Sequence, residues 1–145
     1  KAKRLMYLAD HLYSKYDGDL DLFFSKSTEM LREELLSLHG IGPETADSML
    51  LYAAEKPVFV VDANTKRLCK RLPMVVNADS YDDIQQYIED ELMKQYSNDE
   101  LIKVYNEFHA LIVNLGKYYC KPKPVCANCP LLYLCVFGQE REKED

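Results

Sequence analysis

The stretch LHGIGPETAD, residues 38–47, joins two segments whose apolar residues recur at helical spacing. These residues are Leu31, Leu35 and Leu38 in the first segment, and Ala46, Met49, Leu50 and Ala53 in the second. Gly40 and Gly42 can take a positive φ without a Cβ clash, so the chain can turn sharply here. Pro43 suits the first position of a helix, where its missing N–H costs nothing. The stretch therefore predicts a helix–hairpin–helix.

The backbone amides of such a hairpin, from Gly40 to Gly42, point outward at a helix N-terminus. A helix N-terminus binds anions, and in a long polymer the obvious anion is a nucleic-acid phosphate. An ordinary αα-hairpin that packs for stability explains the same spacing. The spacing alone leaves both interpretations open.

The charge of the chain is unevenly distributed. Its 145 residues could form one domain or two small ones, and the net charge is −6. This negative charge argues weakly against a polyanion as partner, but basic residues gather in two groups. The groups are Lys66, Arg67, Lys70 and Arg71, and further along Lys117, Lys121 and Lys123. An acidic molecule with basic patches remains compatible with DNA.

Nothing in the sequence indicates a membrane partner or a secretory route. No run approaches the ~20 apolar residues of a membrane span, and the N-terminus lacks the apolar core and cleavage site of a signal peptide. We therefore expect a cytoplasmic, monomeric protein. The chain begins without Met and inside a helical pattern, so we expect a C-terminal fragment of a longer protein, inactive by itself.

Almost the whole sequence is patterned for helix, and the expected fold is all-α. The expected helices cover 1–16, 29–38, 43–54, 64–72, 81–96 and 99–115, with a short turn or helix at 20–24. Residues 57–61 have strand-like propensity, but the segment is short and isolated. We expect it to be a buried extended connector.

Four of the five cysteines lie close together with the spacing C-x5-C-x2-C-x5-C; they are Cys120, Cys126, Cys129 and Cys135. An intracellular chain rarely holds disulfides, so metal ligation is the natural interpretation. Structural zinc sites usually take their ligands as two separated pairs, whereas here one pair is flanked by single cysteines. A loop that wraps around a group larger than a single zinc ion fits this spacing better. We therefore predict a [4Fe–4S] cluster held by four thiolates. Cys69, outside the group, is expected to be a small buried hydrophobe.

Asp62 ends the apolar connector and begins the basic helix. Aspartate commonly caps a helix N-terminus, and taken alone this role explains Asp62. A carboxylate here could also face the same surface as the hairpin. An ionised carboxylate can stabilise an oxocarbenium-like sugar and orient an attacking water when a C1′–N bond breaks.

Together these motifs resemble the helix–hairpin–helix DNA glycosylase superfamily, most closely its endonuclease III branch. The hairpin L-x-G-I-G-x-x-T-A at 38–46, the pair Val61-Asp62 and the cysteine loop that begins with G-K-Y-x-C at 116–120 occur in the family's order. The resemblance implies a helical-barrel domain at 1–97, a cluster region at 98–138 and a disordered charged tail at 139–145. Double-stranded DNA would lie between the domains, with the target base flipped out of the duplex.

The resemblance also implies roles for individual residues. Asp62 would be the catalytic residue of a DNA repair glycosylase, and the hairpin carbonyls could hold a monovalent cation. The expected DNA contacts are Gly40, Ile41, Gly42, Thr45, Lys66, Arg67 and Lys70, with Arg71 as a further backbone contact.

The sequence departs from the family pattern at two places. Bifunctional members carry at the position of Glu44 a lysine that attacks C1′, and a glutamate cannot form that Schiff base. The first cysteine interval is five residues, where the usual bacterial enzyme has six. We therefore expect a monofunctional enzyme that releases a base without cutting the strand. The alternatives are a bifunctional glycosylase/lyase that uses another lysine, and a non-catalytic DNA-binding or redox-sensing iron–sulfur module.

Overall fold

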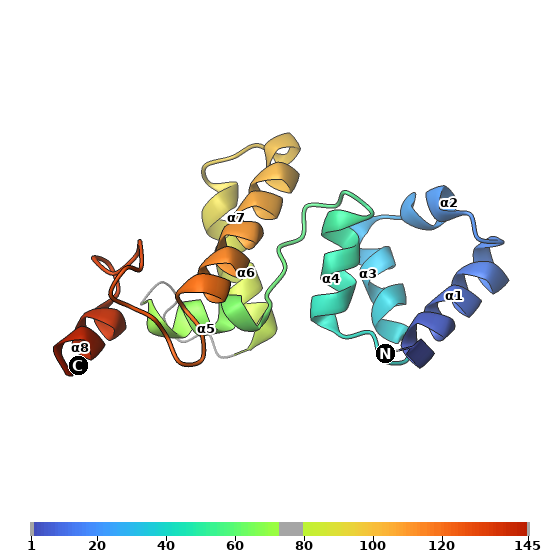
Figure 1. Cartoon of the computed structure of the whole chain (residues 1–145). Coiled ribbons are helices and arrows are strands. Elements are labelled where there is room, and N and C mark those ends of the chain that lie inside the picture. The colour runs from blue at the N-terminus through green and yellow to red at the C-terminus, as the bar shows by residue number, and fades with distance from the viewer. Residues whose placement is uncertain (1, 73–79, 145) are drawn as a thin grey trace. The chain divides into compact units, whose positions relative to one another are not determined.

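The computed structural model describes residues 2–72 and 80–144 of the chain, and the described residues contain helices but no strand (Figure 1). The helices are α1 (Ala2–Tyr16), α2 (Leu20–Phe24), α3 (Thr28–Ser37), α4 (Pro43–Tyr52), α5 (Ala63–Arg71), α6 (Tyr81–Met93), α7 (Asn98–Tyr118) and α8 (Val136–Glu144). The expected all-α class is confirmed. None of the described helices has the length and apolar character needed to cross a bilayer.

The chain divides into two compact units, Lys1–Val58 and Phe59–Asp145. Each unit has buried residues of its own and is described separately below. The division into a barrel domain at 1–97 and a cluster region at 98–138 stays a prediction.

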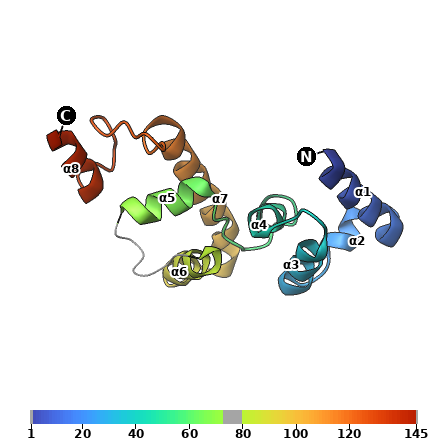
Figure 2. The ribbon, with the colours of Figure 1, turned by 90° about the horizontal axis from the view of Figure 1, so that it is seen from below.

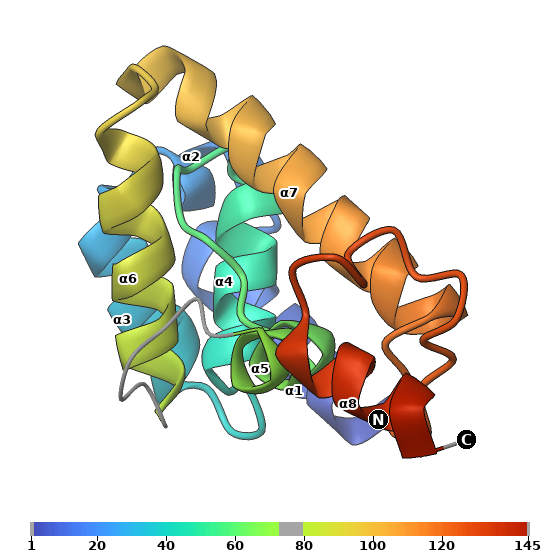
Figure 3. The same ribbon diagram turned by 90° about the vertical axis from the view of Figure 1, so that its left-hand side faces the viewer.

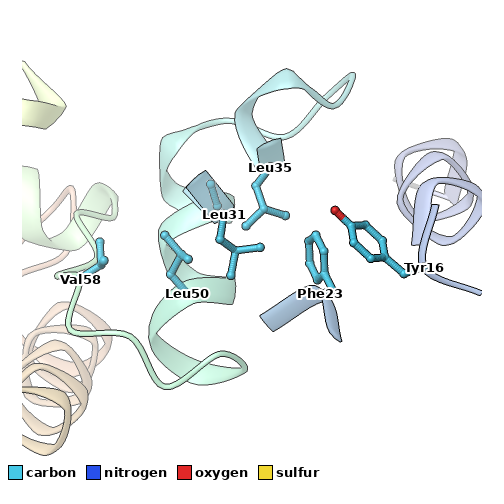
Figure 4. Packing of buried hydrophobic residues seen from close by; sticks show 7 residues of the cluster. Tyr16, Phe23, Leu31, Leu35, Leu50 and Val58 are labelled. Carbon is cyan, nitrogen blue, oxygen red and sulfur yellow. The ribbon is translucent and has the colours of Figure 1, made fainter. Parts of the chain in front are cut away.

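The first unit packs α1 to α4 around one apolar cluster. Phe23, Leu31, Leu35 and Leu50 are fully buried, and the ring of Tyr16 meets that of Phe23 edge-on at 5.1 Å (Figure 4). α3 and α4 pack against each other as the two arms of the predicted hairpin. Leucines recur every three or four residues, so they lie on the face where α3 and α4 meet.

A single carboxylate ties α1 to α3. Glu34 accepts hydrogen bonds from His11 Nε2 at 2.7 Å, Lys15 Nζ at 2.8 Å and Tyr16 Oη at 2.6 Å, and also from Lys26. Burial opposes ionisation of Glu34, but these donors outweigh burial and hold its pKa well below the usual range. Glu34 is thus a charged link between helices that are far apart in sequence.

The second unit packs α5 against α6 and α7 (Figure 2). The connector that leads into α5 is buried and extended, as the sequence predicts. Side chains of α6 bond its backbone: Glu89 accepts from the Phe59 amide at 2.7 Å, and Gln85 donates to the Phe59 carbonyl at 2.6 Å. In a sheet, a neighbouring strand would satisfy the N–H and C=O of Phe59. Here the side chains of Glu89 and Gln85 satisfy them.

The expectation of a disordered tail at 139–145 is wrong for residues 139–144, which continue α8 beside α5 (Figure 3). Glutamine, glutamate, arginine and lysine all have high helix propensity, so a charged run can prolong a helix that has already begun.

Candidate functional site

The hairpin between α3 and α4 turns through one left-handed residue. Gly40 has φ +84°, a conformation that side-chain-bearing residues avoid. Gly42 has φ −103° and caps α4, followed by Pro43 at the start of the helix. Only Gly40 therefore needs to be glycine for its backbone angle.

One of the amides expected to bind an anion is used inside the hairpin itself. Ile41 donates its N–H to the Leu38 carbonyl at 3.1 Å, so this amide is used within the turn. No side chain caps the N-terminus of α4, which leaves the amides of Glu44 and Thr45 without a partner in the first helical turn. These two amides follow Gly42 by two and three residues.

Glu44 lies on the exposed surface in the first turn of α4. A carboxylate there is favoured by the positive end of the helix dipole. The same carboxylate opposes the binding of a phosphate to the neighbouring amides.

Asp62 caps α5, as the sequence predicts. Its Oδ1 accepts from the Thr65 amide at 2.7 Å and the Thr65 hydroxyl at 2.9 Å, and its Oδ2 accepts from Asn64 Nδ2 at 2.7 Å. Partial burial opposes ionisation, but the hydrogen bonds from Thr65 and Asn64 keep the pKa of Asp62 below its usual range. Asp62 is therefore an ionised carboxylate held in one orientation.

Asn64, which the sequence analysis did not single out, is itself held on both sides. Its Oδ1 accepts from Arg67 Nη2 at 2.5 Å. Its side chain also lies against Gly116 of α7, where an added Cβ would overlap Asn64. A glycine inside a 21-residue helix is an unusual choice, and this is the signal that could have pointed to a close contact.

His109 of α7 is a second residue beside Asp62 that the sequence analysis missed. Its Nε2 lies 4.0 Å from Asp62 Oδ2, and its ring meets that of Phe59 edge-on at 6.3 Å. A protonated His109 favours the ionised form of Asp62.

The basic residues of α5 separate into two pairs. Arg67 donates to the Cys120 carbonyl at 2.6 Å, and Arg71 donates to the carbonyls of Lys121 at 2.7 Å and Pro122 at 3.0 Å. Both guanidinium groups are thus turned toward the cysteine loop, whereas sequence reasoning placed them on the DNA.

The lysines of α5 remain on the outside of the unit. Lys66 lies over the ring of Tyr81 at 5.6 Å, and Lys70 is exposed. They are the cations of α5 that can meet a phosphate.

The four clustered cysteines line one cavity, together with Arg71 and Gly138, and none forms a disulfide. Arg71 Nη1 lies 3.4 Å from Cys120 Sγ, and the Gly138 amide donates to Cys135 Sγ at 3.4 Å. Donors aimed at sulfur suit thiolate ligands. Within residues 2–72 and 80–144, no three His, Cys, Asp or Glu side chains close around a single ion.

Burial raises the pKa of Cys126 in the protein alone, and Glu142 and the neighbouring thiols add to this effect. A bound cation would reverse it, because metal-bound thiols ionise. Four thiols that line one cavity without forming a disulfide are the donor set that a thiolate-held metal group requires.

Known proteins resemble this chain in sequence, although no protein-family model matches it. A Methanocaldococcus jannaschii protein provisionally named a DNA repair glycosylase is 41% identical over 137 residues, covering 94% of this chain and 60% of the relative. Endonuclease III of Bacillus subtilis is 31% identical over 145 residues, covering 99% of this chain and 59% of the enzyme. The chain thus spans about three fifths of the length of these relatives.

Solved structures agree with the sequence comparison. An endonuclease III–DNA complex matches with a TM-score of 0.71 and 29% identity, over 98% of this chain and 59% of that chain. The Helicobacter pylori 3-methyladenine DNA glycosylase bound to 1,N6-ethenoadenine matches with a TM-score of 0.69 and 31% identity, over 80% of this chain and 55% of that chain.

Proposed function

Because this chain belongs to the endonuclease III branch of the helix–hairpin–helix DNA glycosylases, we propose that it is the C-terminal part of a DNA N-glycosylase of base excision repair. The observation that carries the proposal is Asp62, an ionised carboxylate fixed by three hydrogen bonds at the N-terminus of α5. A helix cap needs only one of these bonds. The other two fix the carboxylate more firmly than capping requires.

In the proposed reaction, Asp62 stabilises the positive charge that develops on the sugar as the C1′–N bond breaks. It also orients the water whose oxygen forms the new bond to C1′. The base leaves with the bonding electrons, the water loses a proton as it adds to C1′, and the released base gains one from solvent. The base must be flipped out of the duplex, since its sugar bond is inaccessible inside the stack. Asn64 keeps Oδ2 of Asp62 in place during this step.

The hairpin and α5 would bind the DNA backbone. Amides at the N-terminus of α4, including that of Thr45, would donate hydrogen bonds to one phosphate beside the Gly40–Gly42 turn, and a monovalent cation could bind the turn's carbonyls. Lys66 and Lys70 would add contacts that do not depend on sequence. Arg67 would act indirectly, because it bonds Asn64, which in turn holds Asp62.

Cys120, Cys126, Cys129 and Cys135 would hold a [4Fe–4S] cluster. When bound, the cluster supplies a rigid centre for the loop, whose carbonyls Arg67 and Arg71 bond. Residues 98–138 would then form the cluster region and residues 1–97 the barrel domain.

Glu44 supports a monofunctional enzyme, because a carboxylate at this position cannot form an imine with C1′. The second candidate is a glycosylase/lyase that uses a lysine from elsewhere. Borohydride trapping on abasic-site DNA separates the two: a covalent protein–DNA adduct supports the lyase, and none supports the monofunctional enzyme.

The decisive variant is Asp62→Asn in the full-length protein. Asparagine caps helices as well as aspartate does, so the fold persists while the charge is lost. We expect base release to fall by about 100-fold or more. The substrates are duplexes with 3-methyladenine, with uracil or thymine opposite guanine, and with adenine opposite 8-oxoguanine.

Asp19→Asn is the matched control, because Asp19 caps α2 in the same way and has no proposed catalytic role. Full activity of Asp62→Asn would refute the mechanism. DNA binding without base release from any of these duplexes would favour the non-catalytic module.

A further inference from the structure

Arg4, which lies outside every motif of the sequence, packs across the hairpin. A Cβ added to Gly40 would lie 2.8 Å from Arg4 Cγ and 2.9 Å from Arg4 Nε. The arginine side chain therefore lies directly on the glycine backbone, and its guanidinium group is beside the turn. A Cβ at this position would therefore also force the Arg4 side chain to shift.

A second contact fixes the same junction of α1 and the hairpin. The ring of Tyr7, one turn after Arg4, meets the ring of His39 edge-on at 5.6 Å. Tyr7 and His39 are exposed, as is Arg4. The first turns of α1 and the hairpin thus form one continuous exposed surface.

Arg4 differs from the cations that pack within the same unit. Lys15 and Lys26 bond Glu34, and Arg32 bonds Asp47 at 2.7 Å. Arg4 has no carboxylate partner in the described part of the chain, although the chain is acidic overall. A guanidinium group held beside the hairpin turn and without a counter-charge is suited to an anion.

We propose that Arg4 is a phosphate ligand that extends the hairpin site, so that the amides of α4 and the guanidinium group bind the same DNA strand together. The inference rests on the proposed function in one respect, namely that the anion belongs to DNA.

The test measures binding of the full-length protein to an undamaged duplex by fluorescence anisotropy, from 50 to 200 mM salt. Arg4→Met keeps an apolar stem on Gly40 and removes the charge, and Arg4→Ala removes both. For both variants we expect about tenfold weaker binding, and a slope of log K against log [salt] that is lower by about one.

Lys3→Ala is the matched control, because it removes one positive charge from the neighbouring position of α1 and lacks the contact with Gly40. We expect its salt slope to equal that of the wild type. Thermal melting checks that Arg4→Met remains folded. A wild-type slope for Arg4→Met, or an equal loss in Lys3→Ala, would overturn the assignment of Arg4 while the Asp62 proposal stands. Failure of the wild type to bind any duplex would overturn both.

Discussion

At the scale of single residues, Asp62 and Glu44 are two carboxylates in similar positions with different surroundings. Asp62 accepts three hydrogen bonds and is partly buried, whereas Glu44 is exposed in the first turn of its helix. Asp62 is suited to hold a fixed negative charge beside a reacting atom. Glu44 mainly adjusts the charge at the N-terminus of α4.

Glu44→Gln should therefore bind duplex DNA about twofold to fivefold more tightly, since a charge repulsion worth about 1 kcal/mol in water is removed. Its stability should fall slightly, because a favourable charge at the helix N-terminus is lost. Anisotropy and thermal melting measure the two effects. Glu29→Gln, in the first turn of α3, is the control and should leave DNA affinity unchanged; weaker binding by Glu44→Gln would contradict the prediction.

Gly116→Ala should destabilise the protein by about 1–3 kcal/mol, because the new methyl group overlaps Asn64. Base release should fall as well, since Asn64 orients Asp62. Denaturant unfolding and a single-turnover assay measure the two effects.

Asn114→Ala, at an exposed position of the same helix, should be close to neutral in both assays. Alanine has a higher helix propensity than glycine. A more stable Gly116→Ala variant would therefore show that the contact with Asn64 does not matter.

At the scale of elements, long side chains join helices that the sequence places far apart. Glu34 bonds α1 to α3, and Arg67 and Arg71 bond α5 to the cysteine loop. The Arg67–Cys120 bond spans 53 positions of the chain. These links are charge-assisted hydrogen bonds, which are stronger than neutral ones.

Glu34→Gln should lower the free energy of unfolding by about 2 kcal/mol, because several donors lose a charged acceptor. The folded pKa of Glu34 lies below its unfolded value, so its contribution is present above the unfolded pKa of about 4.3 and is lost as the pH falls further. Unfolding at pH 7 and at about pH 3 measures this effect. The wild type should lose more stability than the variant between these two pH values, and equal losses would contradict the link.

At the scale of the whole molecule, the second unit contains a cysteine loop that leaves much of its apolar surface exposed. Tyr133, Leu134 and Val136 are exposed, and the cysteines instead face one cavity. A segment of this kind cannot order itself by burial alone. A cluster held by its thiolates would provide the missing stability.

Cys129→Ser should therefore lose bound iron and the visible absorbance of thiolate-bound iron–sulfur, and the cysteine loop should become sensitive to proteolysis. Cys69→Ala is the control, because Cys69 is buried in α5 away from the cavity. It should keep its iron. Zinc in place of iron in the purified protein would overturn the cluster prediction while leaving the four ligands in place.

Prediction from sequence succeeded where the determining interactions are local. Helical periodicity, the turn at Gly40 and the N-cap Asp62 each depend on a few consecutive residues. The charged tail was misjudged because its apolar content is low, although its helix propensity is high. Arg67 was misjudged because a basic residue on a short helix gives no sign of which surface its side chain meets.

The sequence by itself determined the all-α class, the hairpin, the capping aspartate and the set of four cysteines. Only the tertiary structure decided that Arg67 and Arg71 hold the cysteine loop, and that Arg4 lies on Gly40. The physical reason is the distance along the chain over which each interaction acts. Backbone angles and periodicity are set within a turn or two of chain, whereas the partner of a long charged side chain depends on which distant segment folding brings beside it.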